Sequence, residues 1–450
     1  MLSIGLIFNL GLLGYFKYAG FFVENINHAF DAGFNIPNII LPIGISFFTF
    51  QQIAYLVDAH RGKAKEYSFV NYALFVTFFP QLIAGPIVHH KEMMPQFSKE
   101  FTTKQRWDDF SVGISIFCIG LFKKIIIADT FAIYADAGYG AISAGNALDP
   151  ASALITVLAY SFQIYYDFSG YTDMAVGLAR LFGIKLPVNF HSPYKATGII
   201  EFWRRWHITL SRFFRDYLYI PLGGNQLGVY RTYVNLVCVM LLGGLWHGAD
   251  WTFIIWGIVH GCLLALNHAW ISLRISKLYI LNTKPAHFLA VMLTFFAVTL
   301  AWIPFRAENL DDTVKMLEAI FPSGSGVSSI WTSYYQCWLA QFGDMKNLSD
   351  LTTWFRRQEL WPTVLPPDFL ATYKPVGLLL ACVGIITFML PNTNQIFAKF
   401  NPVLGLSAEK SYHWASLNCL DWKVVLVLSG MFVLSVLQLS RVSPFLYYQF

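Results

Sequence analysis

Charged residues are scarce in this sequence, and their scarcity excludes an ordinary soluble fold. They make up 13% of the chain, against about a quarter in a typical soluble domain. Hydrophobic residues make up 56% and aromatic residues 17%, and apolar stretches near the roughly 20 residues that cross a bilayer recur. We therefore predict an all-α polytopic membrane protein, with nine or ten embedded segments in a single domain over residues 1–450. The expected segments are Leu2–Val23, Ile39–Val57, Phe110–Ala128, Ala153–Tyr166, Val234–Trp246, Trp251–Trp270, Ala286–Phe305, Pro375–Leu390 and Val424–Leu439.

Clustered metal ligands and closely spaced cysteines are also missing. The six cysteines are well separated, and four lie in apolar segments, which favours small buried hydrophobes over a disulfide or zinc framework. His260 and His268 lie eight residues apart on one face of an expected helix, but carboxylate or thiolate partners are absent at ligand spacing. We predict no metal site and no permanently bound cofactor.

A cleavable leader is not evident at the start of the sequence. Met1 is followed directly by apolar residues, without the basic region and small-residue cleavage site of a secretory signal. Leu2–Val23 is therefore expected to be a retained first span.

The net charge of +5 is modest, but the basic residues are clustered. The clusters are Arg61–Lys65, Lys91–Arg106, Lys123–Lys124, Arg204–Arg215 and Arg274–Lys284. The positive-inside tendency assigns them mostly to the cytoplasmic side. Two clusters bracket Tyr72–Val88, an apolar piece with Pro80, Gly85 and Pro86. Because both flanks are then cytoplasmic, we predict a re-entrant element there, with its broken backbone buried in protein or lining a cavity.

The segment Glu201–Tyr219 is too charged to span a membrane and has an amphipathic pattern. Its apolar positions are Phe202, Trp206, Leu210, Phe213 and Tyr217, and its polar positions are Arg204, His207, Ser211 and Arg215. We predict a helix at the membrane interface. Such a helix serves either as an anchor on anionic lipid headgroups or as a docking surface for a phosphorylated cosubstrate, because arginine presents a planar fork to phosphate.

A lone imidazole lies within the apolar run Leu241–Ala249, whose sequence is L-L-G-G-L-W-H-G-A. An ionisable side chain at membrane depth is costly and usually faces a functional cavity. His247 is therefore the first catalytic candidate, and the alternative is a packing histidine bonded to a neighbouring carbonyl.

Several motifs follow one another in order between Gly14 and Arg306. They are G-Y-F-K-Y at Gly14–Tyr18, L-P-I-G-I-S-F at Leu41–Phe47, F-P-Q-L-I-A-G-P at Phe79–Pro86, D-F-S-G-Y-T-D-M-A at Asp167–Ala175, N-F-H-S-P-Y at Asn189–Tyr194, F-W-R-R-W-H at Phe202–His207, D-Y-L-Y-I-P-L-G-G at Asp216–Gly224 and L-G-G-L-W-H-G at Leu242–Gly248. In this combination the chain resembles the membrane-bound O-acyltransferase (MBOAT) family, and most of all the bacterial branch of the alginate O-acetyltransferase membrane subunit.

The resemblance implies a ring of transmembrane helices with re-entrant and interfacial helices around a central funnel. The family's near-invariant intramembrane histidine falls on His247, and a second, more variable polar position falls on His207. His247 then acts as the base that takes the acceptor hydroxyl proton or as a transient acyl carrier. The donor phosphates are expected at basic side chains of two clusters. These are Arg204, Arg205, Arg215, Lys123 and Lys124. The alternative for the two lysines is that their side chains extend to the membrane interface.

The implied activity is transfer of acetyl from cytoplasmic acetyl-CoA, the cosubstrate, for O-acetylation of a cell-envelope or secreted polysaccharide. The implied location is the bacterial inner membrane, with an extracytoplasmic acetyltransferase partner and no nucleic acid. Two alternatives stay open at this stage. One is transfer of another acyl group, such as D-alanine to teichoic acid, and the other is a transporter or flippase, although we find no paired repeats of the kind seen in transporters.

Four further segments carry expectations of their own. Asp167 and Asp173 lie in a polar break between apolar pieces, where they orient a histidine, bind a substrate hydroxyl, cap a helix or belong to a structural network. Ala307–Phe321 is predicted to be a short amphipathic helix with Val314, Leu317 and Phe321 as its apolar stripe. The polar and aromatic interval Ser323–Lys374 follows, and together with this helix it forms a subregion over residues 306–374. The aromatic ending Ser443–Phe450 is expected either at an interface belt or near the acceptor-side funnel. Family members usually carry about two more hydrophobic segments before Gly14–Tyr18, so we expect the chain to lack those N-terminal helices.

Overall fold

The fold is that of a computed structural model, which describes residues 1–35, 39–64, 68–82, 85–100, 102–273, 283–322, 375–405, 421–441 and 446. In this part of the chain the elements are helices, and the one strand-like pairing is an isolated bridge between Pro187 and Leu404. The predicted all-α membrane class is confirmed. The ring around a central funnel and the single-domain boundary stay predictions.

Five helical stretches are long and apolar enough to cross a membrane. Two of them are composite, because a π-helical turn joins two α-helices in each. The first is Leu2–Phe30, with α1 (Leu2–Leu13), η1 (Gly14–Tyr18) and α2 (Ala19–Phe30), and the second is Thr103–Ser143, with α7 (Thr103–Phe122), η2 (Lys123–Ala128) and α8 (Asp129–Ser143). The other three are α12 (Val229–His247), α13 (Trp251–Ser272) and α14 (Lys284–Arg306). Two shorter apolar helices are α19 (Pro375–Met389) and α21 (Trp422–Leu437).

Four of the nine predicted segments are not among these five spans, and two of the four, Pro375–Leu390 and Val424–Leu439, fall on the shorter helices α19 and α21. The expected Ile39–Val57 span falls on α3 (Ile45–His60), which has 16 residues and is shorter than a span. The expected Ala153–Tyr166 span falls within α9 (Pro150–Leu181), a helix of 32 residues. The predicted polar break at Asp167 and Asp173 is therefore wrong, since both residues lie inside a continuous helix.

Buried ion pairs explain why α9 continues through its acidic residues. The ammonium of Lys123 lies 2.6 Å from a carboxylate oxygen of Asp173, and that of Lys124 lies 2.7 Å from Asp167. Both lysines belong to η2, which packs against α9. A carboxylate that is paired and hydrogen-bonded inside the protein does not need contact with water. The helix α9 can therefore continue through its acidic residues.

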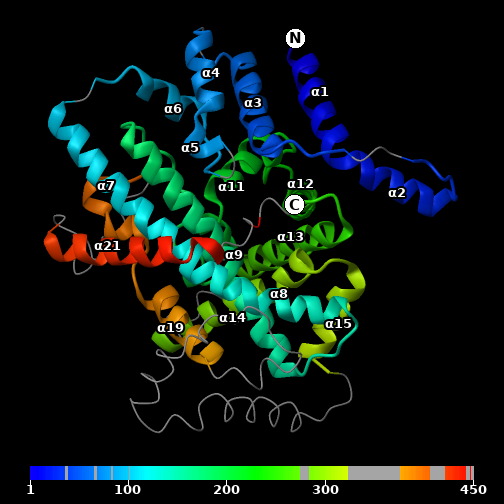
Figure 1. The fold of residues 1–450 in the computed structure, drawn as a ribbon. Coiled ribbons are helices and arrows are strands. Elements are labelled where there is room, and N and C mark those ends of the chain that lie inside the picture. Colours follow the sequence, from blue (N-terminus) through cyan, green and yellow to red (C-terminus); the bar gives the residue numbers. More distant parts are fainter. Residues whose placement is uncertain are drawn as a thin grey trace, which may run out of the picture.

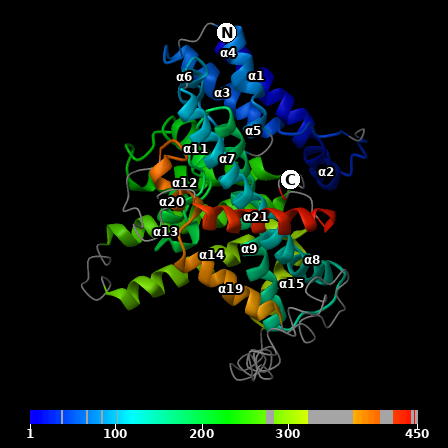
Figure 2. The ribbon, with the colours of Figure 1, turned by 60° about the vertical axis from the view of Figure 1, so that its left-hand side comes forward.

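Small residues let α7 and α9 approach closely at the centre of the molecule. A Cβ atom at Gly120 of α7 would lie 2.6 Å from the carbonyl oxygen of Gly170 in α9. Interfaces of this kind are typical of helices packed inside membranes. Figures 1 and 2 show α21 lying across α7, and α3 and α4 (Phe69–Thr77) at the opposite end of the molecule from α19.

The backbone of Tyr72–Val88 is broken, as predicted, within its described part. α4 ends at Thr77, and α5 (Phe79–Leu82) is a single short turn. The stretch Gly85–Val88 is buried and non-helical, and the backbone N–H of Ile87 donates to Thr209 Oγ1 at 3.0 Å. Polar backbone at such a place needs protein partners; the re-entrant path through the membrane stays a prediction.

The predicted interfacial helix Glu201–Tyr219 is wrong as a single helix. The chain forms α10 (Ile199–Arg205), α11 (Ile208–Phe214) and the π turn η4 (Arg215–Tyr219). His207 separates the first two helices with φ 42° and ψ 53°, in the left-handed region. Such a conformation is uncommon outside glycine and marks a position held by its surroundings. The break turns His207 inward, so it does not lie on the polar face.

The short helix near residue 310 forms, but its buried side differs from the predicted stripe. α15 (Leu310–Ile320) buries Met316 and Ile320, whereas Val314 and Phe321 are about half exposed. Leu317, the third residue of the predicted stripe, is partly buried against the core, and the Asp312 carboxylate accepts a hydrogen bond from Ser143 of α8 at 2.7 Å. The interval Ser323–Lys374 lies outside the described residues. The remaining described helices are α6 (His90–Phe97), η3 (Pro193–Lys195), α20 (Thr393–Ile396), η8 (Ala398–Phe400) and η9 (Leu439–Arg441).

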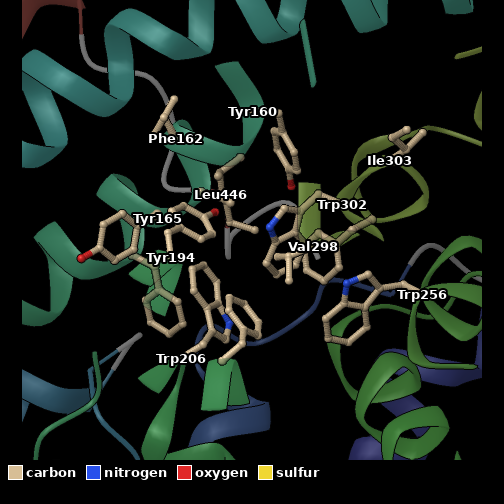
Figure 3. Packing of buried hydrophobic residues seen from close by; sticks show 14 of the residues in the cluster. Tyr160, Phe162, Tyr165, Tyr194, Trp206, Trp256, Val298, Trp302, Ile303 and Leu446 are labelled. Atoms are coloured by element: carbon tan, nitrogen blue, oxygen red, sulfur yellow. The ribbon is translucent and has the colours of Figure 1, made fainter. Parts of the chain in front are cut away.

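An aromatic cluster forms the core between α9, α10, α13 and α14. Figure 3 shows Tyr160 and Tyr194 beside Trp302, with Trp206 and Trp256 further along the same cluster. Leu446, the one described residue of the predicted aromatic ending, is buried in this cluster. Its backbone N–H donates to Asp167 Oδ2 at 3.1 Å. Leu446 therefore lies in the interior and not in an interface belt.

Candidate active site

His247 is the last residue of α12 and lies among aromatic rings. Its ring centroid is 4.8 Å from that of Trp246, 5.1 Å from that of Trp256 and 5.1 Å from that of Phe305. The side chain is 5% exposed. The titratable groups that act on it electrostatically are Lys17, His207 and His260. The structure thus places the predicted histidine in a water-poor environment with other ionisable groups around it.

The local sequence explains how α12 ends at this point. Gly248 has φ −155° and an extended backbone, and Asp250 caps the next helix by accepting from Thr252 N at 2.8 Å. A Cβ atom at Gly244 would lie 2.1 Å from the carbonyl oxygen of Phe253 in α13. The glycines of the L-G-G-L-W-H-G motif therefore let α12 and α13 make the close contact that sets the direction of His247.

His207 is fully buried and also packs near Trp246. Its ring centroid is 6.3 Å from that of Trp246 and 4.7 Å from that of Phe168. Burial lowers the pKa of His207 to about 3, so its imidazole is neutral at physiological pH. The expectation of an exposed position at the membrane interface is wrong, and the two predicted histidines contact the same tryptophan.

Asn189 determines the tautomer of His207. The Oδ1 atom of Asn189 accepts from the Thr209 N–H at 3.3 Å, which identifies it as the amide oxygen. His207 Nδ1 lies 3.1 Å from the same atom, so Nδ1 carries the proton. The other ring nitrogen, Nε2, is then the acceptor and can take up a proton.

The five basic side chains expected to bind donor phosphates are spread over different places. Arg205 pairs with Glu201 at 2.7 Å, Arg215 pairs with its neighbour Asp216 at 2.7 Å, and Arg204 is exposed on α10. Lys123 and Lys124 are drawn into the ion pairs with α9. The alternative for these two lysines, snorkelling to the interface, is wrong, because the carboxylates hold both ammonium groups inside the protein.

A polar cavity of about 460 Å³ lies where α3, α6 and η4 meet. Its residues are Asp58, Arg61, Lys63, His89, Lys91, Glu92, Arg212, Asp216, Tyr217 and Ile220. We call this cavity the basic pocket. Sequence reasoning recognised Arg61, Lys63 and Lys91 as flanks of a re-entrant element and missed them as a binding surface. Only the fold brings the end of α3 beside α6 and η4.

Some charged groups of the basic pocket are engaged with one another. Arg212 forms a two-point ion pair with Glu92, at 2.5 and 2.8 Å. Within the described part of the chain, Arg61, Lys63 and Lys91 form no such pair. Three cations are therefore directed at the cavity without a carboxylate partner there, an arrangement suited to an anionic ligand.

Asp58, His89 and His90 place potential metal-ligand atoms within 4.8 Å of one another. His89 Nδ1 accepts from the Lys91 N–H at 3.3 Å and so caps α6. The proton of its ring is then on Nε2, which lies 2.8 Å from Asp58 Oδ2. A metal bound to Nε2 would move the ring proton to Nδ1, and Nδ1 could then no longer accept the hydrogen bond that caps α6. The geometry therefore fits a hydrogen-bonded His–Asp pair better than a metal site.

A continuous row of rings connects the basic pocket to His247. Tyr217 packs on Phe213 with centroids 5.0 Å apart, and Phe213 stacks on Phe50 at 4.1 Å. Phe50 stacks on Trp246 at 5.2 Å, and Trp246 packs against His247 at 4.8 Å. The pocket and the histidine thus lie at the two ends of one packed aromatic path.

These features define a multi-pass, all-α membrane protein with a buried imidazole site that a row of packed rings connects to a basic pocket. A family model for the membrane-bound O-acyltransferase family, MBOAT, matches residues 46–301. This match covers more than half of the chain and includes both histidines. The protein belongs to the membrane-bound O-acyltransferase family, as the motifs predict.

Named relatives carry related activities. The peptidoglycan O-acetyltransferase of Helicobacter pylori is 48% identical over 349 residues, which are 71% of this chain and 64% of that protein. A probable alginate O-acetylase of Azotobacter vinelandii is 39% identical over 468 residues, which cover 100% of this chain and 84% of that protein. A teichoic acid D-alanyltransferase of Bacillus subtilis is 29% identical over 281 residues, 60% of this chain and 70% of that protein. The chain thus spans less than two thirds of the H. pylori relative.

Proposed function

We propose that the protein transfers an acetyl group from a cytoplasmic thioester, with acetyl-CoA as the donor, towards a hydroxyl of a cell-envelope polysaccharide. The observation that carries the proposal is the burial of His247 among rings at the end of a membrane-spanning helix. The names of the relatives support the reaction class, since two of the three described above are O-acetylating proteins acting on polysaccharides.

In this mechanism His247 is the general base. Its imidazole takes the acceptor hydroxyl proton while the hydroxyl oxygen attacks the thioester carbonyl carbon. The tetrahedral intermediate then collapses, the carbon–sulfur bond breaks, and the thiolate recovers the proton from the imidazolium. Such proton transfer contributes about 10² to 10⁴ in rate. His207, with Nε2 as an acceptor, is the second imidazole near the same tryptophan and helps to orient the acceptor hydroxyl.

The donor enters through the basic pocket in this proposal. The phosphates of acetyl-CoA bind at Arg61, Lys63 and Lys91, and the thioester arm extends along Phe213 and Phe50 towards His247. Basic residues predominate around this pocket, which favours a location of the pocket on the cytoplasmic side of the membrane. This assignment replaces the five basic residues expected from the sequence, which lie in separate ion pairs or on the surface.

The acceptor and the partner follow from the same chemistry. A hydroxyl of an extracytoplasmic acetyltransferase partner reaches His247 from the opposite membrane face, in the bacterial inner membrane, and the acetylated partner then completes the transfer to the polysaccharide hydroxyl. D-alanyl transfer is the second candidate, because the teichoic acid enzyme of B. subtilis is also similar. Acetyl transfer is preferred because the acetylating relatives are more similar to the chain.

The deciding experiment uses membranes that contain the full chain and its partner, with radiolabelled acetyl-CoA and envelope polysaccharide. We expect His247→Ala to lower label incorporation by at least about 100-fold, at equal protein level and unchanged thermal stability in detergent. The matched control is His268→Ala, which removes a half-buried histidine from α13 and should leave incorporation within twofold. Equal incorporation in wild type and His247→Ala would remove His247 from the mechanism. No incorporation from labelled acetyl-CoA in wild type, together with incorporation in a parallel assay with radiolabelled D-alanine on its carrier protein, would select the second candidate.

A further inference from the structure

Lys17 contacts the end of the helix that carries His247. Its ammonium donates to the carbonyl oxygen of Trp246 at 2.6 Å and to that of His247 at 2.9 Å. The neighbouring Tyr18 hydroxyl donates to the carbonyl oxygen of Leu245 at 2.8 Å. Two adjacent residues of one span therefore satisfy three successive carbonyls at the end of another span.

These carbonyls need partners because the last four carbonyl groups of any α-helix have none within the helix. Water is scarce at membrane depth, so each unsatisfied group there costs several kcal/mol. A cation at a helix C-terminus also interacts favourably with the helix dipole. An ammonium with several donors is therefore the side chain suited to end α12 at this place.

A local irregularity brings Lys17 and Tyr18 to this position. Both residues belong to η1, the π turn between α1 and α2. Single π turns inside helices are frequent at functional sites, because they change the direction of neighbouring side chains. The Lys17 ammonium also lies 6.0 Å from the ring centroid of Trp246, within reach of a cation–π interaction.

We infer that Lys17 is a positioning residue for the acyl-transfer reaction. It holds the last turn of α12 and so sets the place and direction of the His247 ring, without contacting substrate itself. The inference rests on the proposed function, in which His247 is the base. Misplacing a catalytic group by about 1 Å can cost about 100-fold in rate, so a loose helix end lowers kcat more than it changes donor binding.

The test compares three variants in the full chain. Lys17→Gln keeps an uncharged N–H donor group and removes the charge, Lys17→Arg keeps the charge, and Tyr18→Phe is the matched control that removes one neutral hydrogen bond. We expect Lys17→Gln to lower kcat by about 10- to 100-fold with KM for acetyl-CoA within about twofold. Lys17→Arg should restore most of kcat, and Tyr18→Phe should lower it by less than about fivefold.

A spectroscopic readout keeps the inference separate from the proposed function. Solid-state NMR of ¹⁵N-histidine-labelled protein, with the His247 signals assigned by their loss in His247→Gln, reports the ring environment without any turnover. Lys17→Gln should shift these signals and Lys17→Arg should return them towards the wild type. Unchanged His247 signals together with a wild-type kcat in folded Lys17→Gln would overturn the inference and leave the proposed function intact. Retained transfer in His247→Ala would overturn the proposed function, and the NMR shifts alone would then decide whether Lys17 positions the ring.

Discussion

The Nδ1 atom of His207 and the Oδ1 atom of Asn189 lie 3.1 Å apart in the buried centre of the protein. The same oxygen accepts from the Thr209 hydroxyl at 2.8 Å, and Thr209 in turn accepts from the backbone N–H of Ile87 at 3.0 Å. One amide oxygen therefore fixes the tautomer of His207, and the threonine links it to the broken segment after α5.

Removing the Asn189 amide should destabilise the protein. In Asn189→Leu, the buried donors of His207 and Thr209 lose their acceptor, which should cost about 1–3 kcal/mol. The measurement is the thermal unfolding midpoint in detergent. Thr172→Val is the control, because Thr172 makes only a 3.4 Å contact with the Asn189 amide nitrogen. A midpoint for Asn189→Leu at or above that of the control would contradict this role.

Neutralising the basic pocket should weaken donor binding. Lys91→Gln should raise KM for acetyl-CoA by about tenfold, the cost of one charge-assisted contact to phosphate, with kcat little changed. The effect should shrink at 0.5 M salt, because surface charges are then screened. Arg204→Gln is the matched control, since Arg204 is exposed and lies outside the pocket. Equal changes in KM for both variants would argue against donor entry at this pocket.

Breaking the ion pair between Lys124 and Asp167 should be costly. Asp167→Ala removes one carboxylate from the buried Lys124 ammonium, which also lies 2.6 Å from Asp129. Loss of one partner of a buried pair costs about 3–5 kcal/mol. Asp216→Ala, which breaks the exposed pair with Arg215, should cost at most about 1 kcal/mol. Chemical unfolding of both variants measures the difference, and similar costs would show that burial does not govern the Lys124 pair.

Adding a methyl group at Gly244 should disturb the contact between α12 and α13. A Cβ atom there would lie 2.1 Å from the Phe253 carbonyl oxygen, so the two helices have to separate. We expect Gly244→Ala to cost at least about 1–3 kcal/mol and to lower acetyl transfer. Gly140→Ala in α8 is the control, because a Cβ there meets no atom within 4 Å and alanine favours helix by about 1 kcal/mol. A Gly244→Ala variant as stable as wild type would refute the close packing.

Acid should destabilise the protein partly through His90. Burial lowers the pKa of His90 to about 4, from 6.5 for an ordinary histidine. Between these values the unfolded chain binds a proton that the folded protein does not, so stability falls as pH falls from 6.5 to 4. His90→Gln should flatten the dependence of the unfolding midpoint on pH in this window. His60→Gln, at an exposed position, should leave it unchanged, and an unaltered slope in His90→Gln would exclude His90 as the cause.

Periodicity and composition predicted the parts of the fold that depend on local sequence. Apolar length is a property of a segment by itself, so the spans at α12, α13 and α14 could be predicted to within a few residues. Breaks in helices that depend on residues distant in sequence could not be predicted in this way. The polar break at Asp167 is wrong because Lys124, distant in sequence, neutralises it, and the interfacial helix is wrong because the backbone turns at His207.

The sequence by itself determined the membrane class and the family and marked His247 as the first catalytic candidate, because these inferences depend on apolar content and on motifs of contiguous residues. Tertiary structure decided which groups meet: Lys17 with the carbonyl of His247, His207 with Asn189, and Arg61 and Lys63 with Lys91 in one pocket. Residues within one helix are placed by its 3.6-residue period, but contacts between helices depend on how those helices pack. Charges and hydrogen bonds act over a few ångströms, so their partners become known only when that packing is known.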